Sequence, residues 1–146
     1  MTTFDRVGPY SPSLSDAARA FLAAPLFGTV ATINPDGSPL QAVIWYQLEG
    51  DFIVFNSRLG RQWPTNLQRC GLASILVADG YDYVEMRGEV EIDDDPVRGQ
   101  AVIAALARRY LTDESEAEAS IAGFAGQLRV TFRLRPSRVF ERLSDD

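Results

Sequence analysis

Short apolar runs separated by tight-turn sequences constrain the fold of this chain more than any other feature. The runs at 27–33 (FGTVATI) and 38–48 (SPLQAVIWYQL) flank NPDG at 34–37, and EGD at 49–51 leads directly into FIVF at 52–55. Such turns join neighbouring strands of an antiparallel sheet. The first half of the chain is therefore predicted to form an antiparallel meander.

Further strands are predicted in the second half of the chain. Residues 81–92 (YDYVEMRGEVEI) show the alternation of a long strand, and Gly88 inside it indicates a bulge or a bend. The last strand, or pair of strands, is expected over 128–134 and 139–143, with an interruption near Pro136.

Helices are expected on either side of these strands. Ser13 and Asp16 resemble a capping box that opens an N-terminal helix. Asp95 and Pro96 have the residue types of an N-cap and a first helical position, and an acidic helix follows over about 113–122.

The pattern as a whole predicts a mainly β chain, in which six or seven antiparallel strands close into a small β-barrel with peripheral helices. A length of 146 residues indicates one domain with a substantial core. Residues 1–12 are expected to form an N-terminal arm and 13–146 the single domain, because glycine and prolines interrupt regular structure before residue 13.

Two residue types are missing, and their absence excludes whole classes of chemistry. The chain has no histidine and no lysine, so that all fourteen basic residues are arginine. Ser-His-Asp and Cys-His catalysis, a Schiff-base lysine and histidine-ligated metal centres are therefore excluded. A carboxylate-only site for Mg²⁺ or Ca²⁺ stays open, but no metal ligand is predicted. If the protein is an enzyme, a bound cofactor is expected to supply the difficult chemical step.

The charge and the hydropathy of the chain limit its expected partners and its expected location. A net charge of -6 with scattered arginines argues against a nucleic-acid partner. No run of about 18 apolar residues is present to span a membrane, and the N-terminus does not resemble a secretory signal. A cytoplasmic location is therefore expected.

The segment 52–78 is the candidate binding region, because its charge differs from that of the rest of the chain. It contains no Asp or Glu but carries Arg58, Arg61 and Arg69, and a short helix that begins near Trp63 would add backbone N–H groups. A cationic loop of this kind is typical of a phosphate or carboxylate clamp. The alternative is a solvated loop whose arginines pair with distant acids.

A second basic segment lies near the C-terminus. No acidic residue occurs in 119–140, and this segment carries Arg129, Arg133, Arg135 and Arg138. These arginines could hold an acidic tail or an anionic substrate. The alternative is a solvated strand face that pairs with the acidic segment 113–118.

Three motifs in order resemble one known family. NPDGSP at 34–39, GRQWPTNLQR at 60–69 and VEMRGEV at 84–90 are similar to the pyridoxamine 5′-phosphate oxidase-like family of split β-barrels, and most similar to its deazaflavin (coenzyme F-420)-dependent reductase branch. The resemblance covers about residues 14–142. It implies an FMN-binding split-barrel fold, a homodimer with two cofactor sites in grooves between the subunits, and a flavin or deazaflavin cofactor.

The resemblance also implies which residues bind the cofactor. The phosphate clamp of the family falls on the loop after the strand that begins at Phe52, and the segment along the cofactor ring falls on 42–45. Trp63 stands where family members commonly carry a lysine, and Arg58 is the candidate replacement for the lost cation. The implied cofactor-binding residues are Val43, Ile44, Trp45, Asn56, Ser57, Arg58, Arg61, Gln62, Trp63 and Asn66. No side chain is named as catalytic.

The resulting functional hypothesis is a reductase that uses coenzyme F-420 to transfer hydride to a small organic acceptor. Two alternatives remain: an FMN-binding oxidoreductase of the same family, and a non-catalytic protein that binds flavin or deazaflavin. Activity as a true pyridoxamine phosphate oxidase is not expected, because the C-terminus lacks the substrate-binding ending of that enzyme, which contains a histidine.

Overall fold

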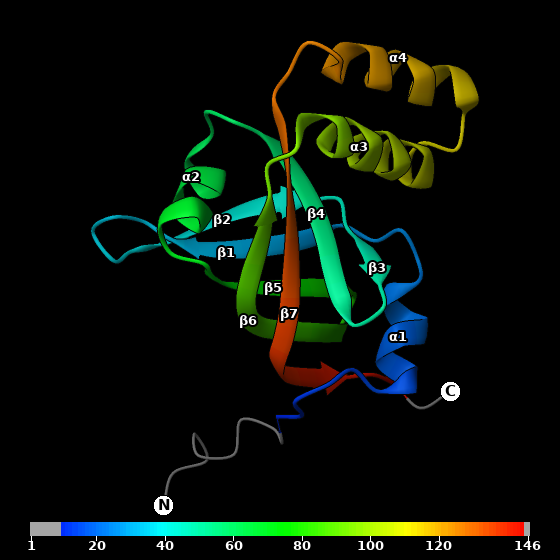
Figure 1. The fold of residues 1–146 in the computed structure, drawn as a ribbon. Helices are drawn as coiled ribbons and strands as arrows, with labels where there is room; N and C mark the ends of the chain where they lie inside the picture. Colours follow the sequence, from blue (N-terminus) through cyan, green and yellow to red (C-terminus); the bar gives the residue numbers. More distant parts are fainter. Residues whose placement is uncertain (1–9, 145–146) are drawn as a thin grey trace, which may run out of the picture.

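Within residues 10–144, which the computed structural model describes, seven strands form one antiparallel sheet with four helices around it (Figure 1). The strands are β1 (Gly28–Ile33), β2 (Pro39–Ile44), β3 (Gln47–Glu49), β4 (Phe52–Arg58), β5 (Leu72–Asp79), β6 (Asp82–Asp93) and β7 (Arg129–Arg142). The helices are α1 (Asp16–Leu22), α2 (Gln62–Arg69), α3 (Pro96–Tyr110) and α4 (Glu114–Phe124). The predicted mainly β, split-barrel architecture is confirmed. Residues 1–9 of the predicted arm lie outside the described residues.

The two edge strands of the sheet follow each other in the sequence, and this explains the split. The strand order is β2-β1-β5-β6-β7-β4-β3, so that β2 pairs with β1 and β3 pairs with β4. The prediction of one continuous strand over 38–48 is wrong, because Trp45 and Tyr46 interrupt it. At this interruption the chain passes from one edge of the sheet to the other.

Two side chains at the C-terminal end of α3 hold the backbone at the interruption. The Tyr110 hydroxyl accepts a hydrogen bond of 3.1 Å from the Tyr46 backbone N–H and donates one of 2.6 Å to the Leu26 carbonyl. Arg109 donates from Nε to the Tyr46 carbonyl at 3.0 Å and from its Nη atoms to the carbonyls of residues 22–24. Main-chain groups that a broken strand and a helix end leave without partners are thereby satisfied.

One apolar core fills the barrel. Phe55 of β4 and Phe132 of β7 lie with ring centroids 5.5 Å apart, and Trp63 of α2 packs against both at 5.9 and 5.6 Å. All three side chains are at least nine-tenths buried. The helix α2 therefore contributes Trp63 to the core and does not only connect β4 to β5.

The long strands β6 and β7 bend around a bulge at Gly88. Their register shifts between Arg87 and Gly88, and a Cβ at Gly88 would lie 2.0 Å from the Arg135 carbonyl oxygen. The predicted bulge is confirmed. The predicted interruption of the last strand is wrong, because β7 continues through Pro136 and accommodates one extra residue, Ser137, opposite the step from Arg87 to Gly88.

The helices confirm one predicted cap and correct another. Asp95 is the N-cap of α3, and its side chain accepts the hydrogen bond from the Arg98 backbone N–H. The N-cap of α1 is Ser15, not Ser13, because the Ser15 hydroxyl accepts from the Ala18 backbone N–H. Figure 1 shows α3 beside β4 and β7, with α4 on its far side. No helix in the described part of the chain is long and apolar enough to cross a membrane.

Candidate functional site

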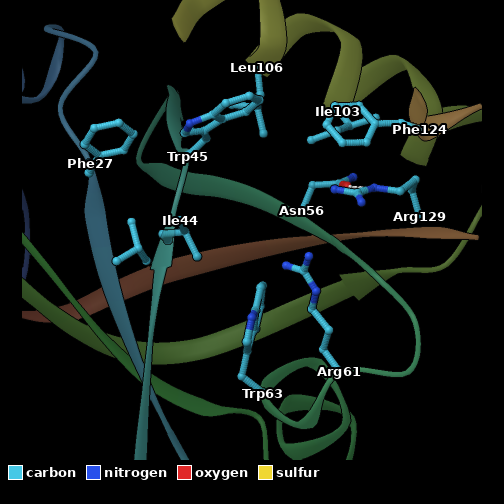
Figure 2. A pocket seen from close by; sticks show the side chains of 11 residues that line it. Phe27, Ile44, Trp45, Asn56, Arg61, Trp63, Ile103, Leu106, Phe124 and Arg129 are labelled. Atoms are coloured by element: carbon cyan, nitrogen blue, oxygen red, sulfur yellow. Dashed lines mark hydrogen bonds between the residues drawn. The ribbon is translucent and has the colours of Figure 1, made fainter. Parts of the chain in front are cut away.

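A cavity of about 210 Å³ lies between α2, α3 and the connection from β2 to β3 (Figure 2). We call it the α3 cavity. It is lined by Phe27, Val43, Ile44, Trp45, Asn56, Arg61, Trp63, Ile103, Leu106, Phe124 and Arg129. Six of the ten predicted cofactor-binding residues are in this set: Val43, Ile44, Trp45, Asn56, Arg61 and Trp63.

The two sides of the α3 cavity differ in chemistry. Figure 2 shows Phe27, Ile44 and Trp45 on one side. The Trp45 ring also stacks in parallel on Tyr110, with ring centroids 5.3 Å apart. On the other side the Arg61 side chain extends from the start of α2 toward Asn56 and Arg129. An aromatic surface beside a cationic one suits a ligand with a planar ring and an anionic group.

Arg129 is a charged residue of the cavity that is almost fully buried. It is 6% exposed, and its guanidinium lies over the Phe124 ring at 4.8 Å. Its Nε donates to the Asn56 side-chain oxygen at 2.9 Å, and one Nη donates to the Gln127 side chain at 2.7 Å. Burial, together with the neighbouring Arg61 and Arg58, lowers the pKa of Arg129 to about 10.

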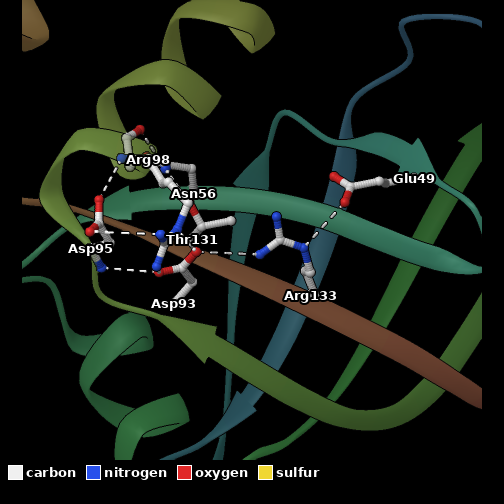
Figure 3. A network of polar contacts seen from close by, with 8 residues as sticks. Glu49, Asn56, Asp93, Asp95, Arg98, Thr131 and Arg133 are labelled. Atoms are coloured by element: carbon white, nitrogen blue, oxygen red, sulfur yellow. Dashed lines mark hydrogen bonds and ion pairs between the residues drawn. The ribbon is translucent and has the colours of Figure 1, made fainter.

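Neither Arg61 nor Arg129 forms an ion pair with a carboxylate of residues 10–144. The arginine further along β7 behaves differently. Figure 3 shows Arg133 between Glu49 and Asp93, with N···O distances of 3.6 and 3.8 Å. Within residues 10–144 the paired carboxylates contact Arg133 and other arginines outside the α3 cavity, so that the cavity keeps uncompensated positive charge.

The arginines of β7 were also considered as partners of the acidic segment 113–118, and the structure corrects this interpretation. Arg133 pairs with Glu49 and Asp93, and Arg129 is buried beside Asn56. The ion pair that does reach this acidic segment comes from Arg108 of α3, at 4.0 Å from Glu114.

Four predicted residues lie outside the lining of the α3 cavity. Ser57 is 1% exposed and its hydroxyl donates to the Arg58 carbonyl, while the Arg58 side chain itself is exposed. Gln62 donates to the Asn66 side-chain oxygen at 2.9 Å.

Asn66 is fully engaged within the protein. Its NH₂ donates to the side chains of Thr32 and Asn34, and its oxygen accepts from Gln62 and Arg69. All the polar groups of this buried amide therefore serve to fix α2 against β1 and the turn that follows it. Its predicted contact with a cofactor stays a prediction, with no unused polar group to make it.

Among the lining residues, the sequence did not single out Phe27, Ile103, Leu106 and Phe124, which form apolar walls. Arg129 was considered together with three other arginines, either as a contact for an acidic tail or an anionic substrate or as part of a solvated strand face. The absence of acids from 119–140 was the available signal for Arg129. It could not show that α3 and α4 cover the start of β7.

The fold and the α3 cavity define a split β-barrel with an aromatic and cationic ligand site. The model of the family described as pyridoxamine 5′-phosphate oxidase matches residues 14–142. The chain therefore belongs to the pyridoxamine 5′-phosphate oxidase family, whose split-barrel fold binds flavin.

Solved structures agree with this assignment. A structure described as an F420 reductase is 30% identical, with a TM-score of 0.72, and the alignment covers 87% of this chain and 98% of that one. The conserved hypothetical protein Rv2991 from Mycobacterium tuberculosis is 26% identical, with a TM-score of 0.75 and coverage of 92% and 89%. A putative pyridoxamine 5′-phosphate oxidase from Listeria innocua, 14% identical with a TM-score of 0.66 and coverage of 88% and 98%, shows the fold alone. The search of curated proteins found no match.

Proposed function

We propose that this protein is an oxidoreductase that binds coenzyme F-420 and reduces a small organic acceptor. The observation that carries the proposal is the α3 cavity, in which Arg61 and Arg129 lack carboxylate partners among residues 10–144 and lie beside an aromatic wall. The similarity to an F420 reductase at 30% identity favours the deazaflavin over FMN. The cytoplasmic location stays a prediction.

The residues of the cavity fit a cofactor with a ring and a phosphate. Arg61 would hold the phosphate with a charge-assisted hydrogen bond, and the N-terminal end of α2 adds partial positive charge. Ile44 and Trp45, at the interruption between β2 and β3, would lie along the ring. A bound deazaflavin or flavin would supply hydride transfer. The contribution of the protein would be to orient the ring, exclude water with Phe124, Ile103 and Leu106, and neutralise the anion.

The small size of the α3 cavity favours a site completed by a second copy of the chain. Sites that bury a drug-sized ligand usually enclose about 300–1,000 Å³, whereas this cavity measures about 210 Å³. Val43 of β2, at the rim, is 71% exposed, and Leu72 and Leu76 of β5, on the other side of β1, are 50% and 40% exposed. We therefore propose a homodimer in which this apolar outer face of the sheet is covered and the site is enlarged.

Arg61→Ala tests the proposed function directly. The variant should weaken the binding of coenzyme F-420 by about 1.5–3 kcal/mol, because a buried phosphate would lose a charged hydrogen-bond donor. Binding is measured by quenching of the fluorescence of Trp45 and Trp63, with coenzyme F-420 and FMN titrated side by side.

Arg108→Ala is the matched control, since Arg108 is an exposed arginine on α3 outside the cavity lining. It should leave both affinities unchanged. Tighter binding of FMN than of coenzyme F-420 would give the function to the FMN-dependent alternative. Binding of neither cofactor by the wild type would contradict the proposal.

A further inference from the structure

The Asn56 side chain contacts the Arg129 guanidinium, and its hydrogen bonds indicate that it orients this arginine instead of donating to a ligand. The Asn56 NH₂ donates to the Gly99 carbonyl at 3.1 Å and to the Thr131 hydroxyl at 3.2 Å, and its oxygen accepts from Arg129 Nε at 2.9 Å. Every donor of the amide is thus used inside the protein. Asn56 therefore has no N–H to offer a ligand, and its oxygen orients the guanidinium.

Gly99 allows α3 to lie close to the strand that carries Arg129. A Cβ at Gly99 would lie 2.1 Å from the Arg129 carbonyl oxygen, so that only glycine lets the first turn of α3 approach β7 at this point. This approach places the Gly99 carbonyl where Asn56 can donate to it. The orientation of Arg129 is therefore fixed from β4, β7 and α3 together.

Within residues 10–144, one nitrogen of the Arg129 guanidinium has no acceptor and can bind a ligand. Nε and Nη1 have acceptors, while Nη2 has none among residues 10–144, and the side chain lines the α3 cavity opposite Arg61. Burying a cation without a carboxylate costs free energy, and a second arginine nearby adds repulsion. An arrangement that is costly in the free protein and fixed from three elements is typical of a binding residue.

We infer that Arg129 is an oxyanion-binding residue of the α3 cavity, oriented by Asn56, and that it and Arg61 grip one phosphate or carboxylate group from two sides. The inference rests on the proposed function only for the identity of the larger ligand. The oxyanion can belong to the cofactor or to an anionic substrate, and the chemistry that recognises it is the same.

Arg129→Met tests the inference, because methionine keeps an unbranched apolar side chain and removes the charge. Its affinity for inorganic phosphate, measured by isothermal titration calorimetry, should fall roughly ten- to hundred-fold. If the oxyanion belongs to the cofactor, affinity for FMN should fall similarly; affinity for riboflavin, which lacks the phosphate, should stay the same in either case. The thermal midpoint without ligand should change little, because the removal of an unpaired buried charge and the loss of the hydrogen bonds to Asn56 and Gln127 oppose each other.

Arg135→Met is the matched control. Arg135 lies on the same strand, is exposed, and carries the same charge, but does not line the cavity. It should bind phosphate like the wild type. Asn56→Asp places a carboxylate against Arg129 Nε, so it should weaken phosphate binding while Arg129 stays in place. Arg129→Lys, which keeps the charge without the planar fork, should recover part of the affinity.

Three outcomes would overturn the inference: unchanged phosphate affinity in Arg129→Met, equal losses for FMN and riboflavin, or no phosphate binding by the wild type. A lower thermal midpoint with unchanged phosphate affinity would make Arg129 a structural residue. If the wild type binds neither flavin nor deazaflavin but binds phosphate through Arg129, the proposed function fails and the inference stands. Phosphate that competes with FMN assigns the oxyanion to the cofactor, and phosphate that binds beside FMN assigns it to a substrate.

Discussion

At the scale of single residues, Tyr46 connects the strand interruption to stability in alkaline solution. Its hydroxyl is fully buried and donates to the carbonyls of Leu22 and Ala24 at 3.0 and 3.1 Å. Burial raises the pKa of Tyr46 to about 12, above the value near 10 expected in the unfolded chain. Between these two values the unfolded chain loses the proton and the folded protein keeps it. The stabilisation is therefore complete below pH 10 and is lost as the pH rises toward 12.

We expect the free energy of unfolding to fall by on the order of 2 kcal/mol across this interval. Tyr46→Phe should be less stable than the wild type at neutral pH, because the hydrogen bonds of a buried hydroxyl are lost and only Arg109 still donates to these two carbonyls, but it should show a smaller alkaline loss. Denaturant unfolding at a series of pH values measures both effects. Tyr81→Phe is the control, since Tyr81 is 87% exposed and its substitution should leave the alkaline slope unchanged. An equal slope in Tyr46→Phe and the wild type would contradict the assignment.

The residues of the candidate site show what a sequence can and cannot predict at this scale. Arg61 was singled out because no acid lies near it in the sequence, and it lines the cavity without an ion pair to any acid in the described part of the chain. Asn56 and Asn66 were named for their amide groups, but whether an amide is free depends on partners more than 30 positions away. The burial of Arg129 could not be predicted, because it depends on the way α3 and α4 cover the start of β7. The residue types and the local charge of the site could be predicted from the sequence. Which of its side-chain polar groups already have hydrogen-bond partners could not.

At the scale of elements, the bulge at Gly88 allows β6 and β7 to bend around the barrel. A Cβ there would meet the Arg135 carbonyl oxygen at 2.0 Å, and backbone atoms cannot rotate away as a flexible side chain can. Gly88→Ala should therefore destabilise the protein by about 1–3 kcal/mol, the range for overpacking. Thermal and denaturant unfolding measure the change.

A second glycine gives the control for this substitution. Gly123 lies in α4, and a Cβ there would have no neighbour within 4 Å. Gly123→Ala should raise the stability by roughly 0.5–1 kcal/mol, because alanine is the better helix former. If Gly88→Ala were as stable as Gly123→Ala, the bulge would not depend on the missing side chain.

The elements themselves were largely predictable, and the failures have a common cause. Turn sequences and the Asp95–Pro96 helix start act through neighbouring residues, and Gly88 is marked by its own residue type within a strand pattern, so that each was identified. The segment 38–48 has the apolar character of one strand, yet it is interrupted at Tyr46 by contacts from Arg109 and Tyr110, 63 and 64 positions away. Contacts of this range leave no local signal.

At the scale of the whole molecule, the α3 cavity depends on the split of the barrel. β2 and β3 lie at opposite ends of the strand order, and the connection between them exposes Trp45 to the cavity instead of burying it in the core. α2 supplies Arg61 from one side, and α3 with α4 closes the other. No two neighbouring segments of the sequence contain the site. The sequence therefore predicted its chemistry better than its shape.

The same outer face of the sheet carries the prediction of a dimer. Val43, Leu72 and Leu76 expose apolar side chains on β2 and β5, and a second groove of about 580 Å³ lies beside them, lined in part by Leu72 and Arg87. An exposed apolar surface of this kind on a small protein usually marks an interaction site. The proposed occupant is a second copy, since a two-fold axis would bring the same patch from both chains together and enlarge both cavities.

Light scattering on the purified protein should give the mass of a dimer. Leu72→Glu with Leu76→Glu should give a monomer, because four carboxylates would be buried in each dimer without partners. The monomer should bind coenzyme F-420 more weakly, since half of the enlarged site is lost. Val97→Glu makes the same change at an apolar residue of α3 that is 78% exposed, and it should leave both mass and affinity unchanged. A wild-type monomer that binds the cofactor with full affinity would show that the α3 cavity acts alone and that the apolar face has another role.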